Sequence, residues 1–402
     1  MEYMTVKEAA KRWKVSERLV QRLCAEERIE GAVKFGRSWK IPLSTKKPLD
    51  PRRDDGTPTT THPSRRTRES HTNLMPLMNT AFEPGHAKEF IQSLEEGPRK
   101  DIAATEYAYF SGNAQEADRI ASAYLEHHDS EIKLSACLIC TYANLPLGRI
   151  TKAQQALTIA RDALVQASTT TPPHQLRAAE AFIAQTASTL LHLPAPTNSP
   201  NAKEVLPLLP PGLRSFAFYV QAHAVYLEGD YARSLGIAET ALLGMEDLYP
   251  IPAIYLHLVA VMDLMSLRRT DEAHVHLLEA WDLACPDDLI EGFGEHHGLL
   301  GGMLEAVIKP AWPEDFKRII AITYRFSAGW RRIHNPTTGD DVADNLTTTE
   351  FAASMLAARG WTNQEIVDHM GVSINTVKSY ISSSLQKLHL TRRQDLKKHM
   401  LA

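Results

Sequence analysis

The chain has 402 residues, of which 44% are hydrophobic and 23% charged, and its formal net charge is −4. A chain of this length is too long for a single hydrophobic core and predicts more than one domain. The composition excludes collagen-like, fully disordered and disulfide-stapled proteins. The charge is uneven: residues 1–53 carry 14 Lys and Arg against 7 Asp and Glu, residues 346–402 carry 7 against 4, and residues 73–345 carry 20 against 34. Basic ends around an acidic centre are expected when the ends meet a polyanion such as nucleic acid.

The sequence favours a cytoplasmic protein that does not associate with membranes. Its start lacks an apolar signal core, and the longest apolar stretch, 253–267, is too short to span a bilayer. The four cysteines are sparse, which suits reduced thiols. Cys137 and Cys140 lie in an apolar helical run, so their C-x-x-C spacing indicates buried thiols rather than a metal or redox site.

Two pairs of adjacent histidines, His127-His128 and His296-His297, are the other candidates for metal ligands. Neighbouring residues on a helix point in different directions. We therefore expect surface histidines, and we expect the chain to hold no metal and no cofactor.

Residues 1–52 predict a winged helix-turn-helix. Thr5 and Glu8 fit a capping box that begins a first helix, and Ser16 suits the N-cap of a second helix over 17–26. Alternating side chains and a glycine in 33–42 then predict a basic β-hairpin.

This segment resembles the excisionase/MerR-type winged helix-turn-helix family over about its first 45 residues. The resemblance implies that one set of side chains enters a DNA groove and another contacts the phosphate backbone. The groove set is Arg18, Gln21 and Arg22, and the backbone set is Lys34, Arg37 and Lys40. A small fold kept for protein contacts is the alternative.

Residues 53–78 are rich in Pro, Thr and charged residues and predict a flexible linker. The segment 79–335 is rich in Ala and Leu, and a turn-to-helix signature recurs in it, starting at Gly112, Gly148, Gly229 and, more weakly, Arg268. The small residues that end these signatures are 36, 81 and 39 residues apart. Such periods predict paired helices that stack into a solenoid.

The unit from Ala222 to Tyr231 resembles a tetratricopeptide repeat, and the longer spacing is similar to the repeats of the sensor region in MalT-type regulators. The resemblance implies a concave surface that binds an effector or a protein. Four aromatic residues are predicted to lie in the core of this body rather than in a ligand cage: Tyr219, Tyr226, Tyr255 and Trp281.

Residues 336–402 predict a second helix-turn-helix. Capping boxes begin helices at Thr347 and Thr362, and Ser373 caps a longer helix over 374–388. One stripe of that helix is apolar, while its other face is polar and has no acidic residue, as a helix in a major groove requires. The polar face consists of Asn375, Thr376, Lys378, Ser379, Ser382, Ser383 and Lys387.

These residues closely resemble the LuxR/GerE-type helix-turn-helix over about 55 residues. The resemblance implies that Lys378, Ser379 and Ser382 face base edges, while Thr376 and Lys387 hold phosphates. It also implies a dimerisation surface on a last helix over 392–401. The candidate residues on that helix are Arg392, Leu396 and Met400.

The sequence contains no phosphate-binding loop, dinucleotide motif, zinc-protease motif or serine-hydrolase elbow, so we expect no enzyme. The prediction is a mainly α protein, with two small helix-turn-helix heads flanking an α-solenoid of tetratricopeptide-like helix pairs. Its expected function is sequence-specific transcriptional regulation, with double-stranded DNA, RNA polymerase, a solenoid effector or protein, and a second copy as partners. The alternatives are an interaction scaffold with docking heads and an accessory factor for DNA recombination.

Overall fold

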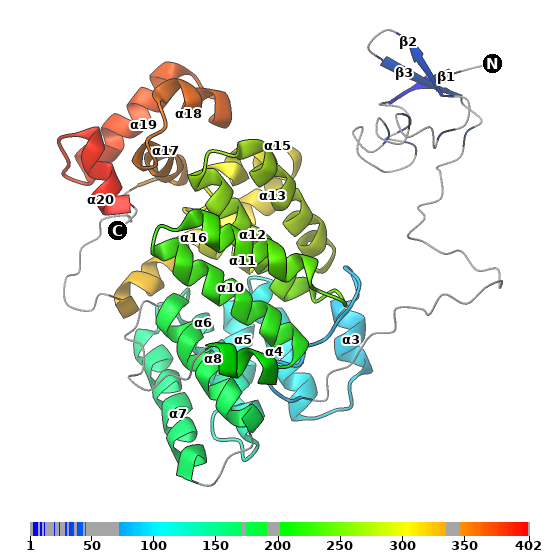
Figure 1. Cartoon of the computed structure of the whole chain (residues 1–402), viewed down its shortest axis with the longest axis vertical. Coiled ribbons are helices and arrows are strands. Elements are labelled where there is room, and N and C mark those ends of the chain that lie inside the picture. The colour runs from blue at the N-terminus through cyan, green and yellow to red at the C-terminus, as the bar shows by residue number, and fades with distance from the viewer. Residues whose placement is uncertain are drawn as a thin grey trace. The chain divides into compact units, whose positions relative to one another are not determined.

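The computed structural model describes residues 72–169, 174–190, 202–334 and 346–400. Of the first 45 residues it describes 3–6, 9, 12, 20, 24, 29, 32–35, 38–42 and 45. The chain forms two compact units, residues 1–64 and residues 65–402. The described residues are mainly α-helical, with a single small sheet in the first unit (Figure 1).

The first unit contains a three-stranded antiparallel sheet of β1 (Tyr3–Thr5), β2 (Val33–Phe35) and β3 (Ser38–Pro42), in the order β1-β3-β2. The predicted hairpin of 33–42 is thereby confirmed. Thr5 ends β1 and Val6 is already helical, while Glu8 of the expected capping box lies outside the described residues. Among the described residues of this unit, a buried hydrophobic cluster consists of Met4, Ala9, Val20, Cys24, Ile29 and Ile41.

The second unit begins with a body of antiparallel helix pairs. The pairs are α4 (Pro98–Phe110) with α5 (Ala114–Ala121), α6 (Ser130–Asn144) with α7 (Ile150–Thr169), α10 (Pro211–Leu227) with α11 (Tyr231–Leu243), and α12 (Pro250–Ser266) with α13 (Thr270–Ala284). Successive pairs also touch, because α5 contacts α6 and α11 contacts α12. The remaining helices are α3 (Ala87–Ser93), α8 (His174–Leu190), α9 (Ala202–Val205), α14 (Glu291–His296), α15 (Lys309–Ala311) and α16 (Pro313–His334).

The turns inside these pairs share one backbone conformation. Gly112, Gly148 and Gly229 have φ values of 83°, 67° and 84°, and Arg268 adopts the same left-handed region with φ 61°. This region costs little for glycine and is uncommon for other residues. The recurring sequence signature therefore marks a real structural turn, including its weaker copy at Arg268.

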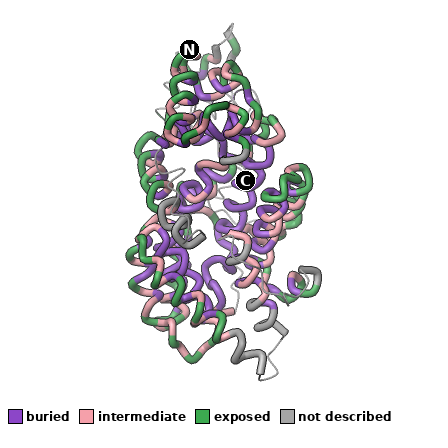
Figure 2. The backbone as a smooth tube through the Cα atoms, turned by 90° about the vertical axis from the view of Figure 1, so that its left-hand side faces the viewer, coloured by how far each residue is buried: buried purple, intermediate pink, exposed green. Residues whose placement is uncertain are grey.

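Helix α12 lies at the centre of the body, in contact with α10, α11, α13 and α14. Nearly all of its residues are buried, as expected for a helix that is apolar on every side. Tyr219, Tyr226, Tyr255 and Trp281 are exposed by only 5% or less, which confirms their prediction as core residues. Figure 2 shows the buried residues in purple, alternating with exposed residues in green along the turns of the helices.

The body begins earlier than the sequence indicated. Leu74, Met75, Leu77 and Met78, which fall in the predicted linker, are at most 2% exposed. The backbone N–H groups of Leu77 and Met78 each donate to the buried carboxylate of Glu106, at 2.9 Å. This partner lies almost 30 residues away and supplies the acceptors that fix the segment, so local composition gives no sign of it.

One pair of histidines was assigned wrongly. His296 and His297 are only 3% and 2% exposed, not surface residues. His296 Nε2 lies 2.7 Å from the Tyr219 hydroxyl, and His297 Nε2 lies 2.9 Å from Glu305 Oε1. Their ring nitrogens thus find polar partners inside the body, as buried polar groups require.

The carboxy-terminal head comprises α17 (Thr348–Ala358), α18 (Asn363–Met370), α19 (Ile374–Lys387) and the short α20 (Leu396–Met400). Both predicted capping boxes are present, because Thr347 and Thr362 each accept from the N–H of the glutamate three residues later and receive its side chain in return. The last helix is shorter than the expected 392–401, since a 3₁₀ turn occupies Arg393–Asp395. Among the described helices, none is both long and apolar enough to cross a membrane.

Candidate nucleic-acid interface

Helix α19 presents one polar, solvent-facing surface. Its apolar stripe faces inward, with Val377 fully buried and Ile381 6% exposed. Four of the residues predicted to contact DNA are exposed on the other side: Asn375, Lys378, Ser379 and Ser382. We call these four residues the reading face. It carries one positive charge, several short hydrogen-bonding groups and no acid. Side chains of this kind can bind base edges and phosphates.

Two further predicted DNA contacts, Ser383 and Lys387, are half-buried and bind an acid of the head itself. The Lys387 ammonium lies 2.8 Å from Glu350 Oε2, and the Ser383 hydroxyl donates to Glu350 Oε1 at 2.6 Å. Both side chains therefore connect α19 to the start of α17. Thr376, also half-buried, lies beside the N-cap, with its hydroxyl 2.8 Å from that of Ser373.

Glu350 is the electrostatic centre of this connection. Burial alone would raise the pKa of its carboxyl, but hydrogen bonds from Lys387, from Ser383 and from Thr347 outweigh burial and lower the pKa to about 2. Glu350 is therefore charged at neutral pH. It closes the capping box of α17 while neutralising a lysine on α19.

The proposed dimerisation residues differ in their surroundings. Leu396 is fully buried and belongs to the core that α20 forms with α17, so it supports its own head. Arg392 is exposed and forms an ion pair with Asp395 at 3.1 Å. Met400 is half-buried. Of the three, Arg392 alone is exposed for a partner.

The head is held against the body through α17, α18 and the turn between them. Arg359 donates to the Tyr226 hydroxyl at 3.0 Å and to the Leu299 carbonyl at 2.6 Å. Arg268, at the turn between α12 and α13, bonds to Glu365 at 3.1 Å and to the Gly360 carbonyl at 2.5 Å. None of these bonds involves the reading face, which stays exposed while the head is docked.

A cleft of about 480 Å³ lies between the head and the body. Arg268, Asp271 and His274 line it from the body, and Trp361 and His369 line it from the head. The His369 ring contacts the carbonyl of Gly301 at 3.1 Å, and burial lowers the pKa of His369. The cleft thus combines an aromatic wall with charged and polar groups from both parts.

Two of the predicted DNA contacts of the first unit lie among the described residues. Lys34 on β2 and Lys40 on β3 are both exposed, and the Lys34 ammonium lies 5.9 Å from the centre of the Trp39 ring. The other four lie outside the described residues: Arg18, Gln21, Arg22 and Arg37. The hairpin therefore presents two cations, as a basic wing requires.

The sequence did not indicate the residues that hold the head in place. Local sequence does not distinguish Arg359 and Arg268 from other cations, because their partners are about 60 to 130 residues away. One signal was available for Arg268: it occupies the turn position that glycine holds in the other helix pairs.

Comparison with known proteins identifies both ends of the chain. Residues 344–400 match the family described as bacterial regulatory proteins, luxR family, and residues 3–45 match a helix-turn-helix domain family. No curated protein and no solved structure was found to match the chain. The matched ranges coincide with the helices of the carboxy-terminal head and with the sheet of the first unit. The chain is therefore a DNA-binding regulator with a luxR-family helix-turn-helix domain near its carboxy-terminal end and a second helix-turn-helix domain near its amino-terminal end.

Proposed function

We propose that the chain regulates transcription by sequence-specific DNA binding through α19. In this proposal α19 enters the major groove, with Lys378, Ser379 and Ser382 at base edges. Asn375 completes the contact surface, and Thr376 lies at the end of the helix nearest the phosphates. The exposure of the reading face in a head that is otherwise packed against the body is the observation that carries this proposal.

The docked head also limits how an effector would act. The reading face is already exposed, so release from the body is not needed to uncover it. We propose instead that the body binds a ligand or protein that changes how two copies associate on paired half-sites. The cleft between head and body supports this idea, because its volume falls within the range of about 300–1,000 Å³ of small-molecule sites.

The remaining partners follow from the regulator role. A second copy of the chain would place two α19 helices one turn of DNA apart, and RNA polymerase would be the target of a regulator bound at a promoter. The first unit would add contacts through Lys34 and Lys40 of its hairpin and through Arg18, Gln21, Arg22 and Arg37. An interaction scaffold and an accessory recombination factor remain the rivals.

A charge reversal on the reading face tests the proposal. Sequences bound by the full chain are first selected from a random duplex library, and the dissociation constant of the best duplex is then measured for variants. Lys378→Glu should weaken specific binding at least about tenfold, since one good base contact contributes ~1–3 kcal/mol. Lys317→Glu is the matched control, because it makes the same charge change on the exposed surface of α16.

The two variants distinguish a sequence-specific regulator from an interaction scaffold. Specific binding that falls with Lys378→Glu and persists with Lys317→Glu supports base reading by α19. Equal affinities for the wild type and for Lys378→Glu, or failure to select any sequence, would favour the scaffold.

A further inference from the structure

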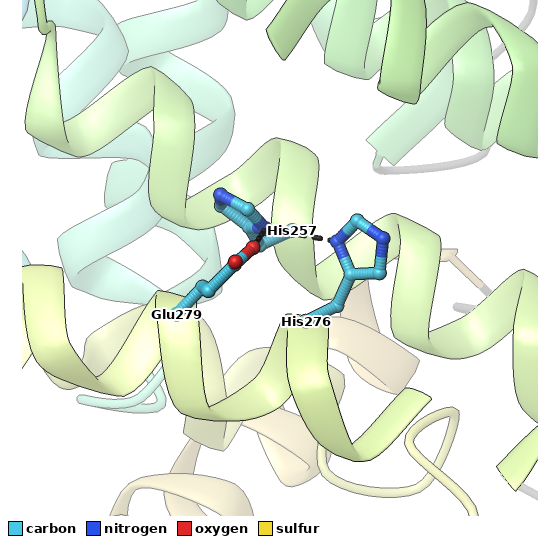
Figure 3. A group of neighbouring side chains, drawn as sticks. All are labelled: His257, His276 and Glu279. Atoms are coloured by element: carbon cyan, nitrogen blue, oxygen red, sulfur yellow. Dashed lines mark hydrogen bonds and ion pairs between the residues drawn. The ribbon is translucent and has the colours of Figure 1, made fainter. Parts of the chain in front are cut away.

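Two histidines and a glutamate meet on neighbouring helices of the body, outside the DNA interface. His257 lies on α12, while His276 and Glu279 lie three residues apart on α13 and so share one face of that helix. Figure 3 shows the three side chains pointing toward one another between the two helices. One ligand atom from each lies within 4.8 Å of the others.

The distances fit the coordination sphere of a small transition-metal ion. The Nδ1 atoms of His257 and His276 are 2.9 Å apart, and His257 Nδ1 lies 3.4 Å from Glu279 Oε2. Two ligand atoms bound tetrahedrally at about 2.0–2.1 Å from Zn²⁺ are separated by about 3.3 Å. These two separations fall on either side of this value, while the ligand atoms of His276 and Glu279 lie within 4.8 Å of each other, so side-chain rotation on α13 would complete the geometry.

The ligand types suit such an ion, because an imidazole nitrogen that carries no proton offers a lone pair to a metal and a carboxylate offers an oxygen.

The surroundings are acidic and open. The His276 Nε2 atom, on the far side of its ring, lies 3.9 Å from Glu239 Oε1 on α11, where a carboxylate can orient a metal-bound imidazole. The side chains of Glu279 and Glu239 are 56% and 48% exposed, which leaves a path from solvent. The remaining charged neighbours, Glu272 and Arg269, pair with each other at 2.5 Å. The local charge that an ion would meet is therefore negative.

We infer that His257, His276 and Glu279 form a binding site for one divalent transition-metal ion of the Zn²⁺ type, with a fourth coordination position open to water. Imidazole and carboxylate ligands suit Zn²⁺, whereas Ca²⁺ and Mg²⁺ prefer oxygen ligands alone. A bound ion would link α12 to α13.

The test is a Zn²⁺ titration of the full chain, stripped of metal with a chelator, in competition with a chromophoric zinc indicator. The wild type should show one competing site per chain. His276→Gln and Glu279→Gln should each weaken that site at least about tenfold, and Glu239→Gln should weaken it less. Co²⁺ in place of Zn²⁺ should give the visible absorption of a tetrahedral site with nitrogen and oxygen ligands, and His276→Gln should abolish it.

A matched control separates this site from other histidines. His127→Gln/His128→Gln removes an adjacent histidine pair on the surface, whose rings lie 4.2 Å apart, and should leave Zn²⁺ affinity unchanged. Thermal melts without metal show whether each variant still folds. Glu279→Gln alters a mostly exposed side chain and keeps the test valid if a histidine variant unfolds. Zn²⁺ binding that is absent, that is unchanged in both site variants, or that is lost in the surface control would overturn the inference.

Discussion

The Lys387 ammonium on α19 lies 2.8 Å from Oε2 of Glu350, the residue that closes the capping box of α17. The carboxylate is 8% exposed, while the lysine is 35% exposed. Arg359, the C-cap of α17, bonds to the body, so one end of α17 contacts α19 through Glu350 and the other end contacts the body. Lys387, predicted as a phosphate contact, therefore also has a partner within the head.

Removing the charge of Lys387 should therefore destabilise the head. Lys387→Met leaves the Glu350 carboxylate without its cation, and we expect the free energy of unfolding of the head to fall by about 1–3 kcal/mol. Amide hydrogen exchange in α17 and α19, recorded at increasing urea concentrations, measures this free energy. Lys378→Met, on the exposed reading face, is the control and should change stability by less than about 0.5 kcal/mol. Normal stability of Lys387→Met with weakened DNA binding would instead identify Lys387 as a phosphate contact.

The same carboxylate makes the head sensitive to acid. The pKa of Glu350 falls from 4.5 to about 2 on folding, so its contribution to stability is present above pH 4.5 and is lost as the pH falls toward 2. As the pH falls across this range, the free energy of unfolding should decline in the wild type. Glu350→Gln should be less stable than the wild type at pH 4.5, and its free energy of unfolding should decline less steeply. Parallel pH profiles for the two proteins would contradict the assigned pKa.

The docking of the head depends on close approach at Gly298. A Cβ atom at this position would overlap the ring of Phe351 on α17. Gly298→Ala should therefore weaken docking by about 1–3 kcal/mol and speed amide exchange at 298–302 by the corresponding factor of about 5 to 150. Gly236→Ala is the control, since a Cβ there meets nothing within 4 Å, and it should leave this exchange unchanged. Amide exchange at 298–302 that is as slow in Gly298→Ala as in the wild type would show that the head does not pack against Gly298.

A buried acid connects the first helix pairs of the body. Asp118 on α5 is 3% exposed and accepts from Asn144 at 2.7 Å, from Arg149 at 2.8 Å and from Lys152 at 2.7 Å. We expect Asp118→Ala to cost about 1–3 kcal/mol of unfolding free energy, less than a fully buried pair, because both cations can regain water. Glu116→Ala on the same helix removes an exposed pair with Arg119 and should have no measurable effect in the same melt. Equal melting temperatures for the two variants would contradict the role of Asp118.

Much of the architecture was predictable because its signals are local. The caps at Thr347, Thr362 and Ser373 act over three residues, and the structure contains all three bonds. The turns at Gly112 and Arg268 likewise repeat one backbone conformation within a few residues. Features of this kind follow from spacing and residue type alone.

The features that sequence reasoning missed depend on distant partners. Lys387 shares the polar face of α19 with the reading face, and its bond to Glu350, 37 positions away, could not be read from that face. His296 binds Tyr219 across 77 positions, and His257 meets His276 through the packing of two helices. Periodicity predicts which face of a helix is polar, but only tertiary packing decides which polar side chains reach solvent.

The most direct test of the central claim is a genome-wide footprint of the full chain, compared with that of the Lys378→Glu variant. If α19 reads bases for a transcriptional regulator, bound sites should share a motif, cluster at promoters and disappear in the variant. Binding concentrated at the ends of mobile elements, or promoter binding that persists unchanged in Lys378→Glu, would contradict it.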